Sequence, residues 1–314
     1  MGRRRKNGRS VNGIFLLNKP CGLSSNQALQ RVKRIFNANK AGHTGALDPL
    51  ATGVLPLCFG EATKFSQYLL DSDKYYRSTY TLGVGTETGD SEGEIISQRD
   101  ASVITEHQVQ QSLTEFCGEI EQIPSMYSAL KHNGQPLYKL ARQGIEVERA
   151  ARKITVYDYQ LLNFRSGSVP QVDVQVHCSK GTYIRTLAED LGRALGCGAH
   201  VSALHRYKSG PFDESQTLTL PEIEAFAEQA TAEQLDDLLK PIDTAVADRM
   251  AIELDENMAA YFQMGQAVIS NKAFRQGQEG DIVRVFRESG AFLGIGIVAE
   301  DGKLAPKRLI VEDA

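Results

Sequence analysis

The sequence predicts an α+β protein with a mixed, mainly antiparallel sheet, flanking helices and a small C-terminal β-domain of the barrel or sandwich kind. Three observations carry this prediction. Strand-like and helical stretches mix along the chain without the strict alternation of parallel α/β proteins. From Ala251 onward, short apolar runs are separated by glycine-rich turns. The 314 residues, 41% of them hydrophobic, suffice for one large domain and one small one.

The N-terminal segment predicts a strand, a helix, a loop and a second helix in succession. Residues 13–20 form a short apolar run that ends at a proline. Ser24 or Ser25 can cap the helix that follows. Its apolar residues recur at helical spacing, at Leu29, Val32, Ile35 and Phe36. Residues 42–53 then form a glycine-rich loop, and a second helix is expected over residues 61–69.

A strand, a turn-rich connection and a helix are expected next. Residues 74–82 alternate in the manner of a strand, so Tyr75 and Tyr76 point to opposite faces of the sheet. Composition alone makes Tyr75 the better candidate for the core. Residues 83–94 contain four glycines and predict turns. A helix is expected over residues 105–118, with Thr105 as its N-terminal cap and Gly118 at its end.

The remaining elements lead from the large domain into the small one. Residues 153–164 and 172–178 predict strands, and Thr182 is expected to cap a helix with Gly196 just beyond its end. The acidic stretch 211–247 contains one further helix and bridges the two domains. In the C-terminal segment the strand-like runs are residues 282–286, 292–298 and 309–311.

Charge distribution and cysteine usage narrow the class of protein. The net charge is −4, yet residues 1–50 hold ten Lys and Arg against one acid, whereas residues 211–250 hold two against ten. This asymmetry favours a surface for a polyanion at one end, although a basic run such as residues 1–10 is also compatible with a solvated tail. Five cysteines without a CxxC pair fit a reducing compartment, and no apolar run is long enough to span a membrane, so we expect a cytoplasmic protein.

Sequence motifs for metals and cofactors are weak. His177, Cys178, Cys197 and His200 could in principle bind zinc, but their spacing matches none of the common ligand patterns. The chain has neither a P-loop nor a dinucleotide-binding fingerprint. We therefore expect no metal and no cofactor.

The most informative segment is the loop of residues 42–53. Three glycines and a proline force it into a tight fold whose backbone can approach a ligand. Pro49 pushes Asp48 towards an extended conformation, so the loop holds this carboxylate in fixed relation to the His43 imidazole. Asp48 is the only acid among the first 50 residues, and we expect its surroundings to favour the ionised form. Composition alone also allows a turn-forming aspartate and a surface histidine.

Residues 42–49 resemble the G-H-x-G-x-L-D-P signature of the TruB family of pseudouridine synthases. Further segments resemble the same family in the same order, namely residues 75–77, 126–142, 178–185 and 196–212. Together they span about two-thirds of the chain. The resemblance implies a pseudouridine-synthase sheet over residues 11–247, behind a basic arm of residues 1–10. It also implies a PUA-like RNA-binding domain over residues 248–314.

Position by position, the resemblance implies an active site. Asp48 matches the essential aspartate, Tyr76 the tyrosine that stacks on the target base and can move its C5 proton, and Arg185 the arginine that pairs with the aspartate. Substrate-binding roles are implied for four residues in all, namely His43, Tyr76, Tyr183 and Leu204. Lys19 and Pro20 match a structural pair near the site.

The implied reaction explains these residue types. Pseudouridine formation breaks a bond from the ribose C1′ to N1 and makes one from C1′ to C5 of the same base, so it needs no cofactor. It needs a carboxylate beside the sugar, acting as nucleophile or base, and a bidentate arginine that keeps this carboxylate ionised and aimed. The uridine must also be flipped out of the RNA and held by an aromatic ring through the rotation.

The resemblance therefore implies an isomerase that converts uridine 55 in the T-arm stem-loop of tRNA. It should act as a monomer, without an obligate protein partner or a membrane. Two alternatives stay open: the catalytic subunit of a guide-RNA-dependent rRNA pseudouridine synthase, and a non-catalytic tRNA-binding or folding factor. Two segments depart from the family pattern: Ser125-Met126 stands in place of Pro-Pro, and His205 stands in place of an arginine. The change at His205 could weaken a phosphate contact. The sequence leaves open whether Asp48 is a nucleophile or a base.

Overall fold

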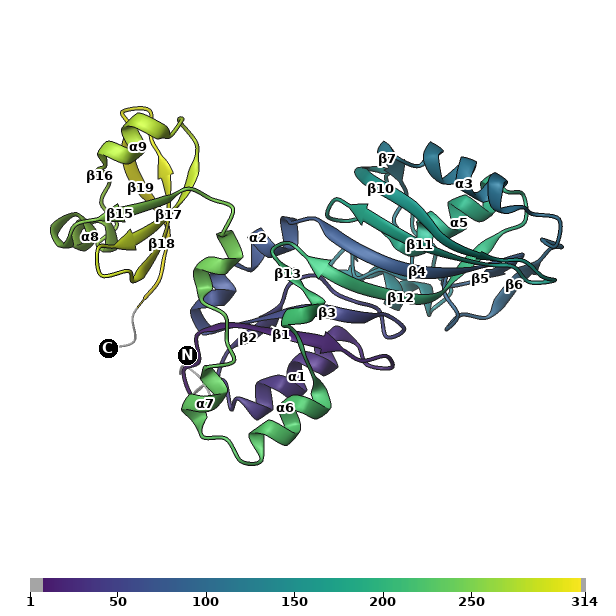
Figure 1. Ribbon diagram of the computed structural model, residues 1–314, viewed down its shortest axis with the longest axis horizontal. Coiled ribbons are helices and arrows are strands. Elements are labelled where there is room, and N and C mark those ends of the chain that lie inside the picture. Colours follow the sequence, from purple (N-terminus) through teal and green to yellow (C-terminus); the bar gives the residue numbers. More distant parts are fainter. Residues whose placement is uncertain (1–7, 312–314) are drawn as a thin grey trace.

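A computed structural model describes residues 8–311. It contains a large unit built on a ten-stranded sheet and a smaller C-terminal unit with a curled five-stranded sheet (Figure 1). Of the predicted N-terminal arm, residues 1–7 lie outside the described residues. Figure 1 shows the C-terminal unit at one end of an elongated molecule, with α3 (Glu106–Glu115) and α5 (Ile184–Ala194) near the other end.

The large sheet is mixed and mainly antiparallel, which confirms the predicted fold class. Its main path is β14 (Leu218–Thr219), β1 (Gly13–Lys19), β3 (Thr52–Phe59), β12 (Ala199–Ser209), β4 (Lys74–Leu82), β11 (Gln171–Cys178), β10 (Arg152–Arg165) and β7 (Gly118–Gln122). Only β14–β1 and β3–β12 pair in parallel along this path. Two short strands flank it, β2 (Ala41–His43) on β3 and β13 (Phe212–Asp213) on β12.

Helices and hairpins surround this sheet. The helices besides α3 and α5 are α1 (Ser25–Ile35), α2 (Ser66–Asp71), α4 (Leu137–Ala141), α6 (Leu220–Ala227), α7 (Ala232–Asp236) and the 3₁₀ turns η1 (Gly60–Lys64), η2 (Glu214–Gln216) and η3 (Ile242–Val246). The hairpins are β5 (Val84–Thr86) with β6 (Ile95–Gln98) and β8 (Lys131–His132) with β9 (Gln135–Pro136).

The two halves of the sheet are covered differently. Around β1 and β3 both faces are buried: Phe15 and Leu17 pack with α1, whereas Ile14 and Leu16 pack with α2, η3 and part of the C-terminal unit. Around β4, β10 and β11 one face packs against α3 and α5, and the opposite face is open to solvent. An antiparallel sheet tolerates such one-sided exposure because its strands alternate apolar and polar residues.

This one-sided cover corrects one interpretation drawn from composition. Tyr76 and Tyr80 lie on the covered face and are buried, whereas Tyr75 lies on the open face. There its ring stacks on His177, with centroids 3.9 Å apart and planes 11° from parallel. The choice of Tyr75 as the core residue is therefore wrong. The side chains of neighbouring residues in a strand point to opposite faces of the sheet. The position of the helices decides which of the two faces is buried.

Several helix boundaries confirm the cap residues that the sequence indicates. Ser24 and Gln27 form a reciprocal capping box before α1, and Thr105 and Gln108 form another before α3. Gly196, with φ of +74°, follows Leu195, the C-cap of α5, as expected.

Other boundaries differ. Thr182 does not cap α5, because its hydroxyl donates to the Ser179 carbonyl, and Tyr183 occupies the cap position. The helix expected over residues 61–69 is two pieces, η1 and α2, joined at Phe65. Gly118 begins β7 instead of ending α3.

The C-terminal unit contains α8 (Glu256–Gln263), α9 (Asn271–Gln276) and the strands β15 (Ala251–Leu254), β17 (Ile282–Arg287), β18 (Phe292–Val298), β19 (Lys303–Leu309) and β16 (Val268–Ile269), in that spatial order. The strand expected over residues 309–311 lies earlier, as β19. This unit contacts the large one through the Phe65 and Phe292 rings, 5.6 Å apart, and through an ion pair between Arg284 and Asp243 at 3.3 Å.

Candidate active site

The loop between β2 and β3 is held in place by two buried side chains, Ser25 and Lys19. The buried Ser25 hydroxyl accepts from the Leu47 amide at 2.7 Å and donates to the Leu47 carbonyl at 3.0 Å. The fully buried Lys19 donates to the carbonyls of Pro20, Leu23 and Pro49, at 2.8, 2.6 and 3.4 Å. Burial lowers the pKa of Lys19 to about 8. These bonds fix the backbone on both sides of Asp48, so its carboxylate projects from a rigid loop.

Asp48 faces Arg185 near the start of α5. The Nε of Arg185 lies 3.0 Å from Oδ2 of Asp48, while its Nη1 donates to the Thr88 carbonyl at 2.7 Å and its Nη2 to the Tyr127 carbonyl at 2.8 Å. The buried carboxylate of Asp90 lies 3.6 Å from the same Nη1. The predicted two-donor pairing with Asp48 is wrong, because two of the three guanidinium nitrogens bind carbonyls of other segments.

The electrostatic setting of Asp48 also differs from the expectation. Its side chain is packed deeply at its base, although 42% of its surface still reaches the cleft. Burial raises the pKa of the Asp48 carboxyl, and Asp90 raises it further, whereas the charges of Arg185 and Lys19 lower it. The pKa is raised overall, so the loop does not simply favour the ionised form. Arg185 opposes the effect of burial and helps keep a charged carboxylate within reach of a substrate.

A cavity of about 270 Å³ lies beside Asp48, and the other aromatic and apolar candidates line it. Tyr76 and Leu204 are each 8% exposed and come from the adjacent strands β4 and β12. Tyr183 lines the same cavity from the start of α5. Asp48 and Arg185 line both this cavity and a larger cleft of about 960 Å³, so the carboxylate sits where the two meet.

His43 lies in the larger cleft with Asp48 and not in the smaller cavity. Its Nδ1 is buried, and among residues 8–311 it has no hydrogen-bond partner. Burial lowers the pKa of the imidazole, and the charge of Arg206 lowers it further. The lowered pKa favours the neutral ring, and its unpaired Nδ1 is turned away from solvent.

Three site residues escaped the sequence analysis, which gave them no role. Asp90 lies in the connection that was interpreted only as turns. Arg206 is 1% exposed and lines the smaller cavity. The buried Gln122 accepts from the Tyr183 amide at 2.8 Å and donates to the Tyr183 carbonyl at 3.1 Å. Each of these residues lies far in sequence from the residue that it contacts. The sequence could have indicated them only through a polar residue beside a recognised motif at a position expected to be buried.

His205, the departure noted in the sequence, lies on the open face of the sheet. Its two ring nitrogens lie 2.8 Å from the Thr52 hydroxyl and 2.8 Å from the Glu214 carboxylate. It therefore joins β3 to η2 and does not line the cavity beside Asp48.

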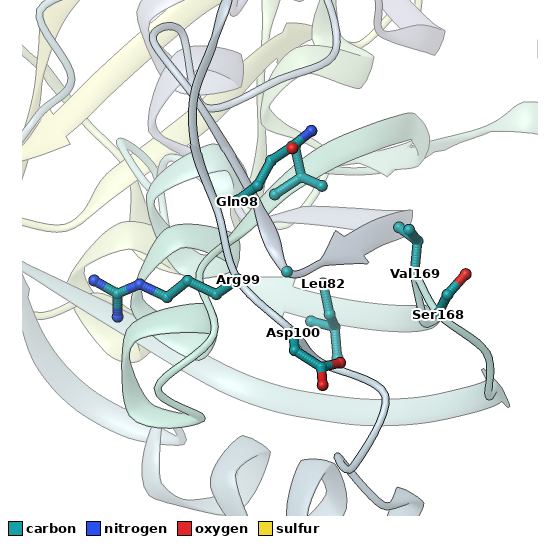
Figure 2. Close-up of a pocket in the computed structure, with 8 residues that line it drawn as sticks. Leu82, Gln98, Arg99, Asp100, Ser168 and Val169 are labelled. Carbon is teal, nitrogen blue, oxygen red and sulfur yellow. The ribbon is translucent and has the colours of Figure 1, made fainter.

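Another pocket lies far from this chemistry. A hollow of about 310 Å³ lies near the end of β4. Figure 2 shows Leu82, Gln98, Arg99 and Asp100 on one side of it and Ser168 and Val169 on the other. None of the predicted site residues lines it.

The residues considered for zinc have other contacts. A ring nitrogen of His200 lies 2.8 Å from the Val84 carbonyl, and the buried Cys178 thiol contacts the Lys74 carbonyl. Within residues 8–311, no three His, Cys, Asp or Glu side chains gather closely enough to hold a metal ion. No helix in this part of the chain is long and apolar enough to cross a membrane.

Three family profiles together match most of the chain. Residues 33–184 match the N-terminal domain of TruB family pseudouridylate synthases, residues 185–247 match the tRNA pseudouridylate synthase B C-terminal domain, and residues 251–310 match the C-terminal region of pseudouridine synthase II TruB. A tRNA pseudouridine synthase B of Saccharophagus degradans is 56% identical over 310 residues, which is 99% of each chain. One of Yersinia pestis is 52% identical over 319 residues, covering 99% of this chain and 96% of that one.

Solved structures share the fold. A chain in a Cbf5-Nop10-Gar1 complex superimposes with a TM-score of 0.70 at 28% identity, covering 96% of this chain and 84% of that one. A chain in an H/ACA RNP bound to a substrate RNA superimposes with a TM-score of 0.73 at 23% identity, covering 99% of this chain and 92% of that one. The second likeness concerns the fold alone.

Proposed function

Because the chain belongs to the TruB family of pseudouridylate synthases, we propose that it converts uridine 55 in the T-arm of tRNA to pseudouridine, with Asp48 as its catalytic carboxylate. The enzyme is a tRNA pseudouridine synthase, an isomerase, like its full-length relatives. The observation that carries the proposal for Asp48 is its position: the carboxylate lies 3.0 Å from a buried arginine, where the cleft meets a cavity large enough for one base.

The geometry supports a role for each neighbour. A uridine flipped into the smaller cavity would lie against Tyr76 and Leu204, with its ribose towards Asp48. Stacking on an aromatic ring contributes about 1–3 kcal/mol per base, which offsets much of the cost of flipping. The Asp48 carboxylate then attacks C1′ or removes a proton from the sugar, and the base detaches and turns. Tyr76, which lines this cavity, takes the C5 proton.

The substrate and the cellular setting follow from the same proposal. The T-arm stem-loop carries the recognised features, and the enzyme works as a cytoplasmic monomer without an obligate protein partner. The cysteines within residues 8–311 are all free, which fits a reducing compartment. We assign residues 11–247 to catalysis and residues 248–314 to a PUA-like RNA-binding domain, whose compact sheet stands beside the catalytic unit (Figure 1).

One observation favours a second candidate. The fold is shared, at 28% identity, with a chain solved in a Cbf5-Nop10-Gar1 complex, so a guide-RNA-dependent activity is the alternative. The identity of 52–56% over the full length to tRNA pseudouridine synthases B, against 28% to the Cbf5 chain, supports the stand-alone enzyme.

The test uses purified full-length protein, an unmodified T-arm stem-loop and no guide RNA. We expect pseudouridine at position 55 by mass spectrometry, and Asp48→Asn should abolish turnover while tRNA binding stays within about tenfold, because phosphate contacts provide most of the affinity. Product only in the presence of a guide RNA would favour the alternative. Near-wild-type activity of Asp48→Asn would contradict the role of Asp48, and tRNA binding without any product would indicate a folding factor.

A further inference from the structure

Arg206 is a buried cation without a counter-ion. It is the largest fully buried side chain among the described residues, with 1% of its surface exposed. No carboxylate within residues 8–311 forms an ion pair with it, whereas the other buried arginine of the site, Arg185, faces two. A buried guanidinium without an anion is costly, so its retention calls for an anion that arises during function.

The hydrogen bonds of Arg206 hold its guanidinium between the two ends of the loop that joins β2 to β3 and carries Asp48. Its Nε donates to the Val54 carbonyl at 2.8 Å and its Nη2 to the Gly45 carbonyl at 3.1 Å. Its backbone pairs with Gly53, where a β-carbon would come within 2.3 Å of the Arg206 carbonyl oxygen. Only glycine allows this approach, so the guanidinium is placed rigidly.

The group that Arg206 faces is the Tyr76 hydroxyl. Arg206 and Tyr76 are cross-strand partners in β12 and β4, and both line the cavity beside Asp48. Burial raises the pKa of the Tyr76 phenol overall, and the charge of Arg206 and its hydrogen bond to the hydroxyl oppose this rise. The other ionisable groups facing the hydroxyl are Cys178 on β11 and Asp48 on the loop, and both raise this pKa.

The nearby Lys74 is occupied elsewhere. Its Nζ donates to the carbonyls of Leu69, Leu70 and Ser72 at 2.9, 2.8 and 2.5 Å, so it joins the end of α2 to β4. Burial lowers the pKa of Lys74 to about 8. Arg206 is therefore the cation whose charge and hydrogen bond both act on the Tyr76 oxygen.

We propose that Arg206 is a positioning residue that stabilises a negative Tyr76 oxygen, and that it thereby makes Tyr76 the base for the C5 proton. The inference rests on the proposed function of Asp48 and Tyr76. After the phenol has released its proton to solvent, the phenolate accepts the proton from C5 of the rotated base. The electron pair of the broken C5–H bond restores the C5–C6 double bond, the pair of the C6–N1 double bond moves to N1, and N1 takes a proton from solvent. The phenol then returns this proton to solvent.

The test separates the C5 step from the rest of the reaction. Arg206→Lys keeps a cation but loses the planar guanidinium with its several donors. We expect the single-turnover rate on a stem-loop to fall about tenfold or more. Substrate deuterated at C5 should then react more slowly still, with a primary isotope effect larger than that of the wild type. With 5-fluorouridine at the target position there is no C5 proton to remove, so Arg206→Lys should rearrange it as fast as the wild type. A structural defect would slow both substrates.

Arg77→Lys is the matched control, because Arg77 follows Tyr76 on the same strand but lies half-exposed on the open face, paired with Glu214 at 3.1 Å. It should change neither the rate nor the isotope effect. Equal slowing of uridine and 5-fluorouridine by Arg206→Lys, or an unchanged isotope effect, would overturn the proposal. A wild-type protein that makes no pseudouridine would instead refute the proposed function.

A second measurement covers the case in which Arg206→Lys does not fold. 3-Fluorotyrosine placed at position 76 of the otherwise unchanged chain reports its own ionisation by ¹⁹F NMR. Because burial raises the pKa of the Tyr76 phenol overall, we expect the probe at position 76 to ionise at higher pH than free 3-fluorotyrosine. It should still ionise at lower pH than the same probe at Tyr80, a fully buried tyrosine whose pKa burial raises with no cation of residues 8–311 beside it. Ionisation at position 76 at the same pH as at position 80, or above it, would show that Arg206 does not stabilise the phenolate and would overturn the proposal.

Discussion

At the scale of single residues, Arg185 is the centre of the site. Its guanidinium contacts Asp48 from the loop between β2 and β3, the Thr88 carbonyl and the Tyr127 carbonyl, each through a different nitrogen. Three chain segments that are distant in sequence therefore meet on one side chain that is 6% exposed. A fixed planar fork suits this task, because its donors cannot move independently of one another.

Replacing Arg185 with lysine should consequently be harmful although the charge is kept. An ammonium group cannot reach all three partners, so we expect kcat to fall by roughly a hundredfold as Asp48 loses its alignment. Binding of tRNA should change by less than about tenfold. Single-turnover rates and filter binding measure the two quantities. Arg193→Lys on the same helix, 76% exposed, is the control and should behave as the wild type. A fast Arg185→Lys enzyme would show that alignment by the fork is dispensable.

The raised pKa of Asp48 predicts the acidic limb of the pH–rate profile. The reaction needs the carboxylate, so the rate is lost as pH falls through the pKa of Asp48, which burial raises above the ordinary value of an aspartate. Because the charge of Arg185 lowers this pKa, Arg185→Met should move the limb to higher pH in addition to slowing the reaction. Single-turnover rates across the acidic range test this. A limb that stays in place would mean that another group controls it.

At the scale of elements, β7 positions the start of α5. The Gln122 amide bonds both the amide and the carbonyl of Tyr183, the cap residue of a helix that has no side-chain cap of its own. One side chain thus replaces the missing cap and fixes the backbone two residues before Arg185. Residues 123–127 follow Gln122 directly in the chain. They end at Tyr127, whose carbonyl accepts a hydrogen bond from Arg185.

Gln122→Glu should convert this link into a pH-dependent one. An ionised carboxylate cannot donate to the Tyr183 carbonyl and is repelled by it, so we expect kcat to fall about tenfold or more at neutral pH. A protonated carboxyl restores both bonds, so the ratio of variant to wild-type rate should rise as pH falls. Melting temperatures at each pH exclude global unfolding. Glu121→Gln, an exposed neighbour on β7, is the control. A pH-independent ratio would contradict the role of Gln122.

At the scale of the whole molecule, an acidic protein must bind RNA through local positive surface. Arg9, inside the predicted basic arm, is already committed: its Nη1 and Nη2 lie 2.6 and 2.7 Å from the two oxygens of Asp236 in α7. It therefore ties the start of the described chain to the acidic bridge, which leaves residues 3–6 as the candidates for phosphate contacts.

Deleting residues 1–7 isolates those contacts while leaving the Arg9–Asp236 pair intact. Each lost phosphate contact should reduce the salt slope of log K by about 0.7–0.9, while kcat at saturating tRNA stays unchanged. Titrations of full-length tRNA at several salt concentrations measure the slope. An unaltered slope would show that the arm is a solvated tail.

Local sequence determined much of this protein. The caps Ser24 and Thr105, the strand over residues 74–82 and the tight loop around Asp48 depend on contacts within a few residues, which pattern and turn chemistry express directly. The order of its motifs indicated the family, which the full-length relatives confirm. The assignment of roles to Asp48, Tyr76 and Arg185 stays a prediction until the variants are measured.

Tertiary structure decided the rest, because those features depend on pairings between distant segments. Which of Tyr75 and Tyr76 faces the core was settled by α3 and α5 covering one side of the sheet. The partners Asp90, Gln122 and Arg206 reach the site from about 40 to 160 residues away from Asp48 along the chain, and no local pattern encodes such a meeting. Arg206 is the clearest case: its residue type suggests a surface cation, but the pairing of β12 with β3 buries it and the pairing of β12 with β4 places it beside Tyr76.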